Sequence, residues 1–101
     1  MTTAFAPVMA RSLVWIAAHR GERLVGYVNV AGDGGVHAFI LDTTVHPDEG
    51  RRGLGVRLVH AAADEARARG AHWLHVDYEA GLEPFYAACG FRPTSAGLLP
   101  L

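Results

Sequence analysis

The hydrophobic period of this 101-residue chain changes from that of strands to that of a helix at the segment 46–53, and that change limits the folds open to it. Before the segment, three apolar and partly β-branched stretches predict strands, at 12–18, 24–30 and 36–45. Turn signals separate them, Gly21-Glu22 after the first stretch and the glycine-rich residues 32–35 after the second. Strands joined by such short connections predict an antiparallel three-stranded meander.

After the segment, apolar residues recur at the spacing of an amphipathic helix, at Leu54, Leu58, Ala62 and Ala66. Gly70 is the residue type that ends such a helix. Residues 73–78 return to a strand pattern, and Pro84 predicts the first turn of a short helix at 85–89 that Gly90 ends. From residue 91 the chain is expected to be extended, although Pro93 and Pro100 limit a last strand.

A strand–helix–strand crossover is right-handed and places the strands 36–45 and 73–78 side by side and parallel. The order β-β-β-α-β-α therefore predicts an α/β fold on a mixed sheet, an antiparallel meander followed by β-α-β-α. We expect one domain over 1–101, because a chain of this length allows only one. Its predicted parts are a leader at 1–11, the meander at 12–45, a loop and central helix at 46–70, and a strand, helix and C-terminal strand at 71–101.

Charge and composition exclude several classes of protein for this chain. The formal net charge of −1 gives no overall field for nucleic acid or an anionic membrane, so we expect neither as a partner. Cys89 is the single cysteine, which excludes an internal disulfide and a multi-cysteine zinc site. The apolar stretches are shorter than the roughly 20 residues of a membrane-spanning helix. The first residues lack a signal-peptide pattern, so we predict a cytoplasmic protein.

The segment that joins the third strand to the central helix has the composition of an anion-binding loop. It contains three glycines and three arginines, Gly50, Arg51, Arg52, Gly53, Gly55 and Arg57. The first turn of a helix leaves backbone N–H groups unpaired, and glycines let a phosphate approach them closely. A glycine-rich turn with solvated arginines fits the same residues, and local sequence does not choose between the two interpretations.

Two segments resemble the signatures of the GCN5-related N-acetyltransferases (the GNAT family). The first is Val45-His46-Pro47 followed by Gly50-Arg51-Arg52-Gly53-Leu54-Gly55, and the second is Phe85-Tyr86-Ala87-Ala88-Cys89-Gly90-Phe91. They stand in the family's order, with a helix and a strand between them. The resemblance extends from Ser12 to the C-terminus and implies the GNAT-like acyl-CoA N-acyltransferase fold.

The resemblance also implies a co-substrate, acetyl-CoA, and no metal. Its pyrophosphate would lie on the amides of residues 51–56, which are Arg51, Arg52, Gly53, Leu54, Gly55 and Val56. Thr44 and Val45 would lie along the pantetheine arm. Glu79 stands where the family often has an asparagine that contacts the cofactor. Tyr86, by its place in the second signature, would be the general acid that protonates the departing thiolate.

Besides Glu79, the chain departs from the family pattern in two further ways. Gly50 occupies the position where the family has arginine or glutamine. Only eleven residues precede the first predicted strand, whereas family members usually begin with a further strand and two helices that wall the acceptor site. A short form of this kind would expose a sheet edge and an apolar face, so we predict a homodimer or pairing with another chain.

Acetyl transfer also needs a base that takes the proton of the acceptor amine, directly or through water. Asp42 is the candidate that we select, with His46 and Glu79 as alternatives, although each is more often a structural or solvated residue. The histidines predict no metal site, because His72 and His75 would point to opposite faces of a strand. Cys89 is expected to be a buried residue rather than an acyl-accepting thiol.

The sequence therefore predicts a protein that moves an acetyl group from acetyl-CoA to an amine by direct attack, with Tyr86 as general acid. A non-catalytic module of the same fold, binding an acyl-CoA or a partner, is the alternative. A piece of a longer enzyme is a third interpretation. The acceptor is not specified by the sequence.

Overall fold

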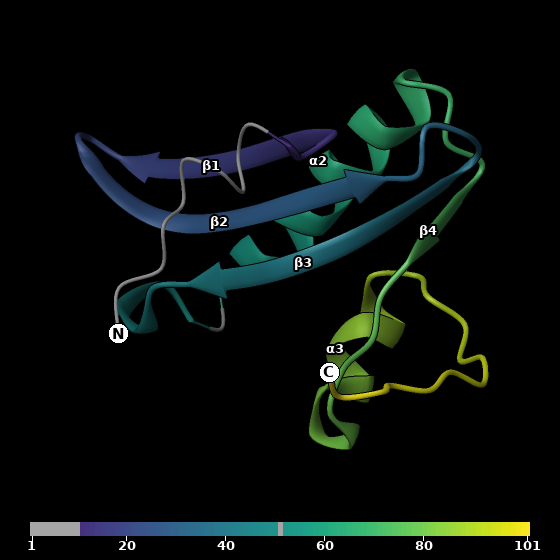
Figure 1. Ribbon diagram of the computed structural model, residues 1–101. Coiled ribbons are helices and arrows are strands. Elements are labelled where there is room, and N and C mark those ends of the chain that lie inside the picture. Colours follow the sequence, from purple (N-terminus) through teal and green to yellow (C-terminus); the bar gives the residue numbers. More distant parts are fainter. Residues whose placement is uncertain (1–10, 51) are drawn as a thin grey trace.

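The computed structural model describes residues 11–50 and 52–101 and has the predicted order of elements (Figure 1). The strands are β1 (Val14–Arg20), β2 (Arg23–Gly32), β3 (His37–Val45) and β4 (Trp73–His75). The helices are α2 (Leu54–Ala68), α3 (Glu83–Ala88) and the short 3-10 turns η1 (Pro47–Glu49) and η2 (Ala80–Leu82). The predicted leader at 1–11 falls, except for its last residue, outside the described residues. None of the described helices has the length and apolar character needed to cross a membrane.

The sheet is mixed, as predicted, with the strand order β1-β2-β3-β4. The β1–β2 and β2–β3 pairs are antiparallel, whereas β3 and β4 are parallel. β4 pairs with β3 only from Trp73 to His75, so the predicted strand at 73–78 is too long. Beyond the residues that pair with β4, β3 continues to Val45 along β2, whereas residues 76–79 form no ladder with it.

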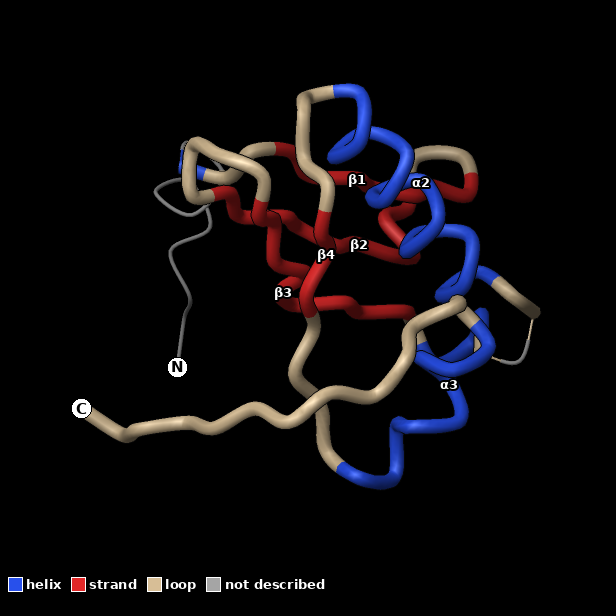
Figure 2. The backbone as a smooth tube through the Cα atoms, turned by 90° about the vertical axis from the view of Figure 1, so that its right-hand side faces the viewer, coloured by secondary structure: helices blue, strands red, loops and turns tan. Residues whose placement is uncertain are grey.

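One face of the sheet is covered by α2 (Figure 2). The core consists of alternate residues of β2 and β3, together with the apolar stripe of α2, and its members are Val28, Val30, Ala38, Ile40, Leu58, Val59, Ala62 and Ala66. This confirms the helical face predicted from the spacing. The intervening strand residues point to the opposite face, where Trp15, Phe39, Leu41 and Trp73 are large apolar side chains that remain exposed.

The ends of α2 are set by glycines. Gly53 precedes the helix with a φ of 77°, a left-handed conformation that side-chain-bearing residues rarely adopt. Gly53 itself has no side chain that could cap this end by a hydrogen bond. Gly70, with a φ of 97°, follows the other end and lets the chain turn toward β4, as predicted.

The predicted C-terminal strand is wrong. Residues 91–101 form neither helix nor strand, and Leu98 and Leu99 are 83% and 82% exposed. Pro93 and Pro100 lack the N–H group that a ladder needs, and the adjacent stretch 76–79 is not a strand either. The preceding helix is confirmed with Pro84 in its first turn, although α3 begins two residues earlier than predicted.

Candidate functional site

A bulge interrupts the pairing of β2 and β3 near the C-terminal end of β3. Asn29 pairs with Leu41 and Tyr27 with Thr44, so two residues of β3, Asp42 and Thr43, lie opposite the single residue between them on β2. Asp42 has a φ of 58°, which is the left-handed region that few non-glycine residues occupy. Bulges of this kind redirect side chains and occur frequently beside active sites.

Asp42, the predicted base, is exposed and is held by two polar contacts at this bulge. The side-chain N–H of Asn29 (Nδ2) donates to its Oδ2 at 3.1 Å, and the hydroxyl of Thr44 donates to its carbonyl oxygen at 3.0 Å. Asn29 is only 1% exposed, and its Oδ1 is buried without a partner among the described residues. Sequence reasoning did not select Asn29, although an amide in the middle of an apolar strand was the available signal.

The start of α2 has the form of an anion cradle. Arg57 is the first residue whose N–H bonds back to Gly53, at 3.1 Å, so the amides of Leu54, Gly55 and Val56 have no acceptor within the helix. A Cβ built on Gly53 would meet nothing within 4 Å, which leaves open space beside these amides. The residues present therefore fit a phosphate group, which the helix dipole also favours here. Arg51, also predicted for this loop, lies outside the described residues.

Gly55 has a different role from the one that the loop composition suggested. A Cβ at this position would lie 2.9 Å from Cε1 of Phe85 and 3.6 Å from Cγ2 of Val45. The space beside its backbone is therefore filled by α3 and the end of β3 rather than left for a phosphate. Gly55 brings the two signature segments into contact, because α3 can pack against the first turn of α2 only where a side chain is missing.

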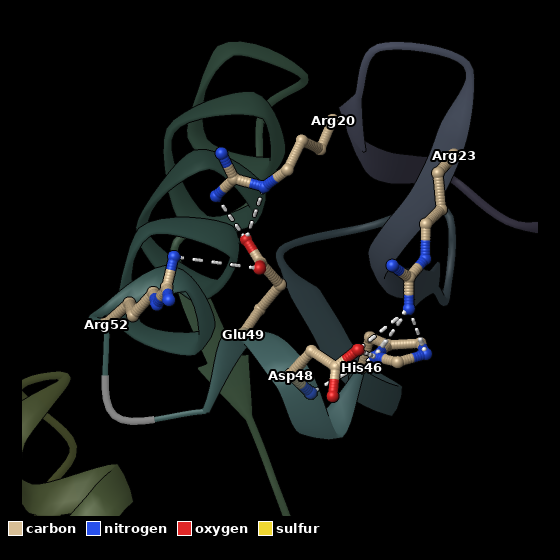
Figure 3. Close-up of polar contacts among 6 residues, drawn as sticks. All are labelled: Arg20, Arg23, His46, Asp48, Glu49 and Arg52. Carbon is tan, nitrogen blue, oxygen red and sulfur yellow. Dashed lines mark hydrogen bonds and ion pairs between the residues drawn. The ribbon is translucent and has the colours of Figure 1, made fainter.

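Glu49 anchors the loop between β3 and α2 (Figure 3). Its side chain is 9% exposed and its Oε1 accepts hydrogen bonds from Nε and Nη2 of Arg20, at the end of β1, with the Nε contact at 3.0 Å. Nη1 of Arg52 lies 3.9 Å from its other oxygen. The guanidinium of Arg20 holds the pKa of Glu49 below its ordinary value, and Glu49 raises the pKa of Arg20. Arg52, predicted to bind the cofactor, is thus next to the cradle and partly neutralised.

His46 is engaged in the same loop. Its Nδ1 accepts the N–H of Asp48 at 3.1 Å and so caps η1, while Nη2 of Arg23 lies 2.7 Å from its Nε2 and donates to Asp48 at 3.1 Å (Figure 3). These contacts give His46 a structural task in the loop. Of the three candidate bases, Asp42, His46 and Glu79, only Asp42 lies within β3.

Tyr86, the predicted general acid, lies within an aromatic cluster on α3. It is 6% exposed and stacks on Tyr78 at 4.8 Å between ring centroids, with Phe85 and Phe91 edge-on at 4.9 and 5.7 Å. Its ring is therefore fixed in orientation. The contacts of Tyr86 and those of Asp42 involve different residues, and no hydrogen bond among the described residues joins the two predicted catalytic side chains.

Two surface grooves adjoin the C-terminal residues, one beside the chain after β4 and the other between α2, β4 and residues 89–94. The first, of about 840 Å³, is lined by Tyr78, Glu79 and Thr94 among others, and the second, of about 650 Å³, by Cys89 and His60 among others. Glu79 thus faces the C-terminal segment. Burial raises the pKa of the Cys89 thiol, which makes it a weaker nucleophile at neutral pH.

The structure pairs two histidines that the sequence did not connect. Nδ1 of His37 lies 2.9 Å from Nε2 of His75 across the β3–β4 ladder, and His75 stacks on Phe39 at 4.7 Å. Two ligands alone do not make a metal site. The part of the chain that the structure describes contains no group of three or more potential metal ligands.

Comparisons with known proteins agree with this geometry. The model of the acetyltransferase (GNAT) family matches residues 5–91. A GNAT-family acetyltransferase of Streptococcus pneumoniae superposes with a TM-score of 0.84 at 25% identity over 99% of this chain and 80% of its own. A Trypanosoma brucei acetyltransferase gives 0.77 at 24% identity over 96% and 75%.

Among curated proteins, the mycothiol acetyltransferase of Rhodococcus erythropolis is 33% identical over 63 residues, 62% of this chain. That match spans 21% of the relative's own length. A mycothiol acetyltransferase of Mycobacterium marinum matches at 33% over 55 residues, which are 54% of this chain and 17% of the relative.

Proposed function

The chain belongs to the acetyltransferase (GNAT) family, and from that premise we propose that it transfers an acetyl group from acetyl-CoA to an amine by direct attack. The observation that carries the proposal is the uncapped first turn of α2, with open space beside Gly53. The backbone amides of residues 54–56 and the side chain of Arg52 would bind the pyrophosphate there. Arg51 belongs to the same predicted loop and lies outside the described residues. Thr44 and Val45, at the end of β3, would contact the pantetheine arm.

The proposed reaction needs three proton transfers. Asp42 takes a proton from the acceptor ammonium group, and the freed nitrogen lone pair attacks the thioester carbon. The nitrogen of the resulting tetrahedral intermediate then loses its second proton to water. The carbon–sulfur bond breaks, and the Tyr86 hydroxyl gives its proton to the departing thiolate. The products are the N-acetyl amine and CoA with a free thiol, and Tyr86 and Asp42 return to their starting states by exchange with water. No acetyl-enzyme forms.

A non-catalytic module that binds acyl-CoA is the second candidate, and one observation favours it. Tyr86 is 6% exposed and packed on three sides by aromatic rings, as a core residue would be. In this case the start of α2 still binds acyl-CoA, but no acetyl group is transferred.

A thermal-unfolding series with acetyl-CoA tests the cofactor site. A ligand that binds only the folded state stabilises it by about 2.7 kcal/mol at a hundredfold excess over its Kd. We expect the midpoint to rise with acetyl-CoA concentration and to stay unchanged with an equal concentration of a plain adenine nucleotide. No shift with millimolar acetyl-CoA would contradict both the enzyme and the acyl-CoA-binding module.

Tyr86→Phe separates these two candidates, because it removes the hydroxyl and keeps the ring in its cluster. We expect acetyl transfer to fall by about a hundredfold, the lower end of the range for a general acid, with the acetyl-CoA midpoint shift unchanged. Tyr78→Phe is the matched control, since it removes a hydroxyl from the adjacent stacked ring. Equal activity of Tyr86→Phe and the unmodified protein would exclude the assigned role.

We also propose a second copy of the chain as partner and a reducing compartment, the cytoplasm, as location. Exposed apolar side chains, which include Leu98 and Leu99, support self-association. The lone, unpaired thiol of Cys89 supports the reducing environment.

A further inference from the structure

The sheet face that α2 leaves uncovered has a definite chemical character. Its residues alternate with those of the core, and the bulge adds Asp42 to the same side as Leu41. The described strand residues of this face are Trp15, Ala17, His19, Tyr27, Asn29, Ala31, His37, Phe39, Leu41, Asp42, Thr44, Trp73 and His75. Asp42 is the only carboxylate in this set, and the set contains no arginine. We call it the open face.

Asn29 holds this carboxylate in place. It pairs in register with Trp15 on one side and Leu41 on the other, so it lies at the centre of the open face. Its Nδ2 donates to Oδ2 of Asp42 at 3.1 Å, and its own side chain cannot move freely because it is 1% exposed. Asp42 itself is exposed. One carboxylate oxygen is therefore fixed by a buried amide, while the group as a whole remains open to a ligand.

Large apolar side chains share the open face with Asp42. Trp15 is 45% exposed, Leu41 41% and Phe39 39%, all on the same face. A single negative charge beside exposed aromatic and aliphatic surface is complementary to a cation that carries an apolar group. An acidic or phosphorylated molecule would find no arginine among these residues and would face the charge of Asp42.

We infer that the acceptor binds on the open face and is a primary amine with an apolar, preferably aromatic, body and no acidic group. Its ammonium group faces Asp42, its body contacts Trp15 and Leu41, and Asn29 acts as a positioning residue for the carboxylate. This inference rests on the proposed acetyl transfer, since it assigns the second substrate of that reaction.

The first test compares amines with the full chain and acetyl-CoA. Phenethylamine presents the required groups, phenylalanine adds only a carboxylate, and glucosamine replaces the aromatic body with hydroxyl groups. We expect kcat/KM for phenethylamine to exceed both others by at least about tenfold, the factor that about 1.4 kcal/mol of transition-state binding produces. An equal or higher kcat/KM for glucosamine or phenylalanine would overturn the assigned acceptor class.

The second test asks whether Asn29 acts through Asp42. We expect Asp42→Asn to lower kcat/KM for phenethylamine by about a hundredfold and Asn29→Ala by about tenfold. In the Asp42→Asn background, Asn29→Ala should cost no more than about twofold, because the bond that it removes is already impaired. A full tenfold loss in both backgrounds would show a merely structural role. Asp64→Asn, an exposed exchange of the same type on α2, is the control.

Two further readouts keep the outcomes distinct. If Asn29→Ala does not fold, Asn29→Ser replaces it in the double-mutant cycle with Asp42→Asn. The comparison of amines needs neither variant and tests the acceptor class by itself. An acetyl-CoA midpoint shift with no transfer to any amine would refute the proposed transfer and, with it, the acceptor site. Transfer to amines with the wrong preference would refute the acceptor site alone.

Discussion

At the residue scale, Glu49 controls how the loop before α2 responds to acid. Its pKa is lowered in the folded protein, chiefly by the hydrogen bond from Arg20. A carboxyl group with a lowered folded pKa stabilises the fold above its ordinary pKa of 4.5, and this contribution disappears as the pH falls through the lowered value. The sign is therefore a loss of stability with acid.

Glu49→Gln should remove this pH dependence. We expect the variant to melt a few degrees below the unmodified protein at pH 6, and the two midpoints to converge as the pH falls through the lowered pKa of Glu49, because protonated Glu49 resembles glutamine. Thermal unfolding followed across this pH range measures the difference. Asp64→Asn, whose partner Arg67 is 73% exposed on its side chain, should change little at either pH. A constant difference between Glu49→Gln and the unmodified protein at all pH values would contradict the prediction.

Contacts between side chains on different strands were beyond sequence reasoning. The spacing of His72 and His75 predicts that these two do not form a metal pair, whereas the contact of His75 with His37 depends on the β3–β4 register, which the sequence does not specify. The same holds for Asn29 and Asp42, which meet because a bulge shifts β3 by one residue. Asp42 was selected from its place near a strand end, whereas its partner required the structure.

At the scale of elements, the contact of α3 with the start of α2 depends on the missing side chain of Gly55. A methyl group at that position would lie 2.9 Å and 3.1 Å from ring atoms of Phe85. We expect Gly55→Ala to cost about 1–2 kcal/mol net, because overpacking outweighs the better helix propensity of alanine. Chemical denaturation measures the loss, and the acetyl-CoA midpoint shift should shrink with it.

Two variants make this prediction specific. Gly81→Ala adds a methyl group where nothing lies within 4 Å, so its stability should be nearly unchanged. Gly55→Ala combined with Phe85→Leu should be less destabilised than the sum of the two single variants, because the smaller side chain relieves the contact. Strict additivity would mean that Phe85 is not what Gly55 accommodates.

Periodicity was sufficient for the elements that bury one face and insufficient for the rest. The repeat of Leu58, Ala62 and Ala66 predicted α2 because each of these residues packs on the sheet. The ends of β4 and the fate of residues 91–101 depend on whether a neighbouring edge supplies hydrogen-bond partners. Local pattern contains no such information, and the predicted C-terminal strand was wrong for that reason.

At the scale of the whole molecule, exposed leucines at the C-terminal end predict self-association. Leu98 and Leu99 are more than four-fifths exposed and adjacent in sequence. We expect light scattering coupled to size-exclusion chromatography to give the mass of a dimer, and Leu98→Asp with Leu99→Asp to give a monomer. The open face should stay free for the acceptor, so Trp15→Glu should leave the mass unchanged. A monomer for the unmodified protein would contradict this prediction.

The short pairing of β4 has a consequence for how the chain folds and unfolds. β1, β2, β3 and α2 follow one another in sequence and in space, so they can assemble with little loop closure. Residues 73–101 join them through three ladder positions, the contacts of His75 with His37 and Phe39, and the bond between His60 and the Cys89 carbonyl. Phe85 packs on Gly55, and partly buried side chains of this segment, Leu74, Val76 and Phe91 among them, pack against the core. Backbone amides of this last third should therefore exchange with solvent sooner than those of β2 and α2. We therefore expect the segment that contains Tyr86 to unfold before β2 and α2 and to refold after them.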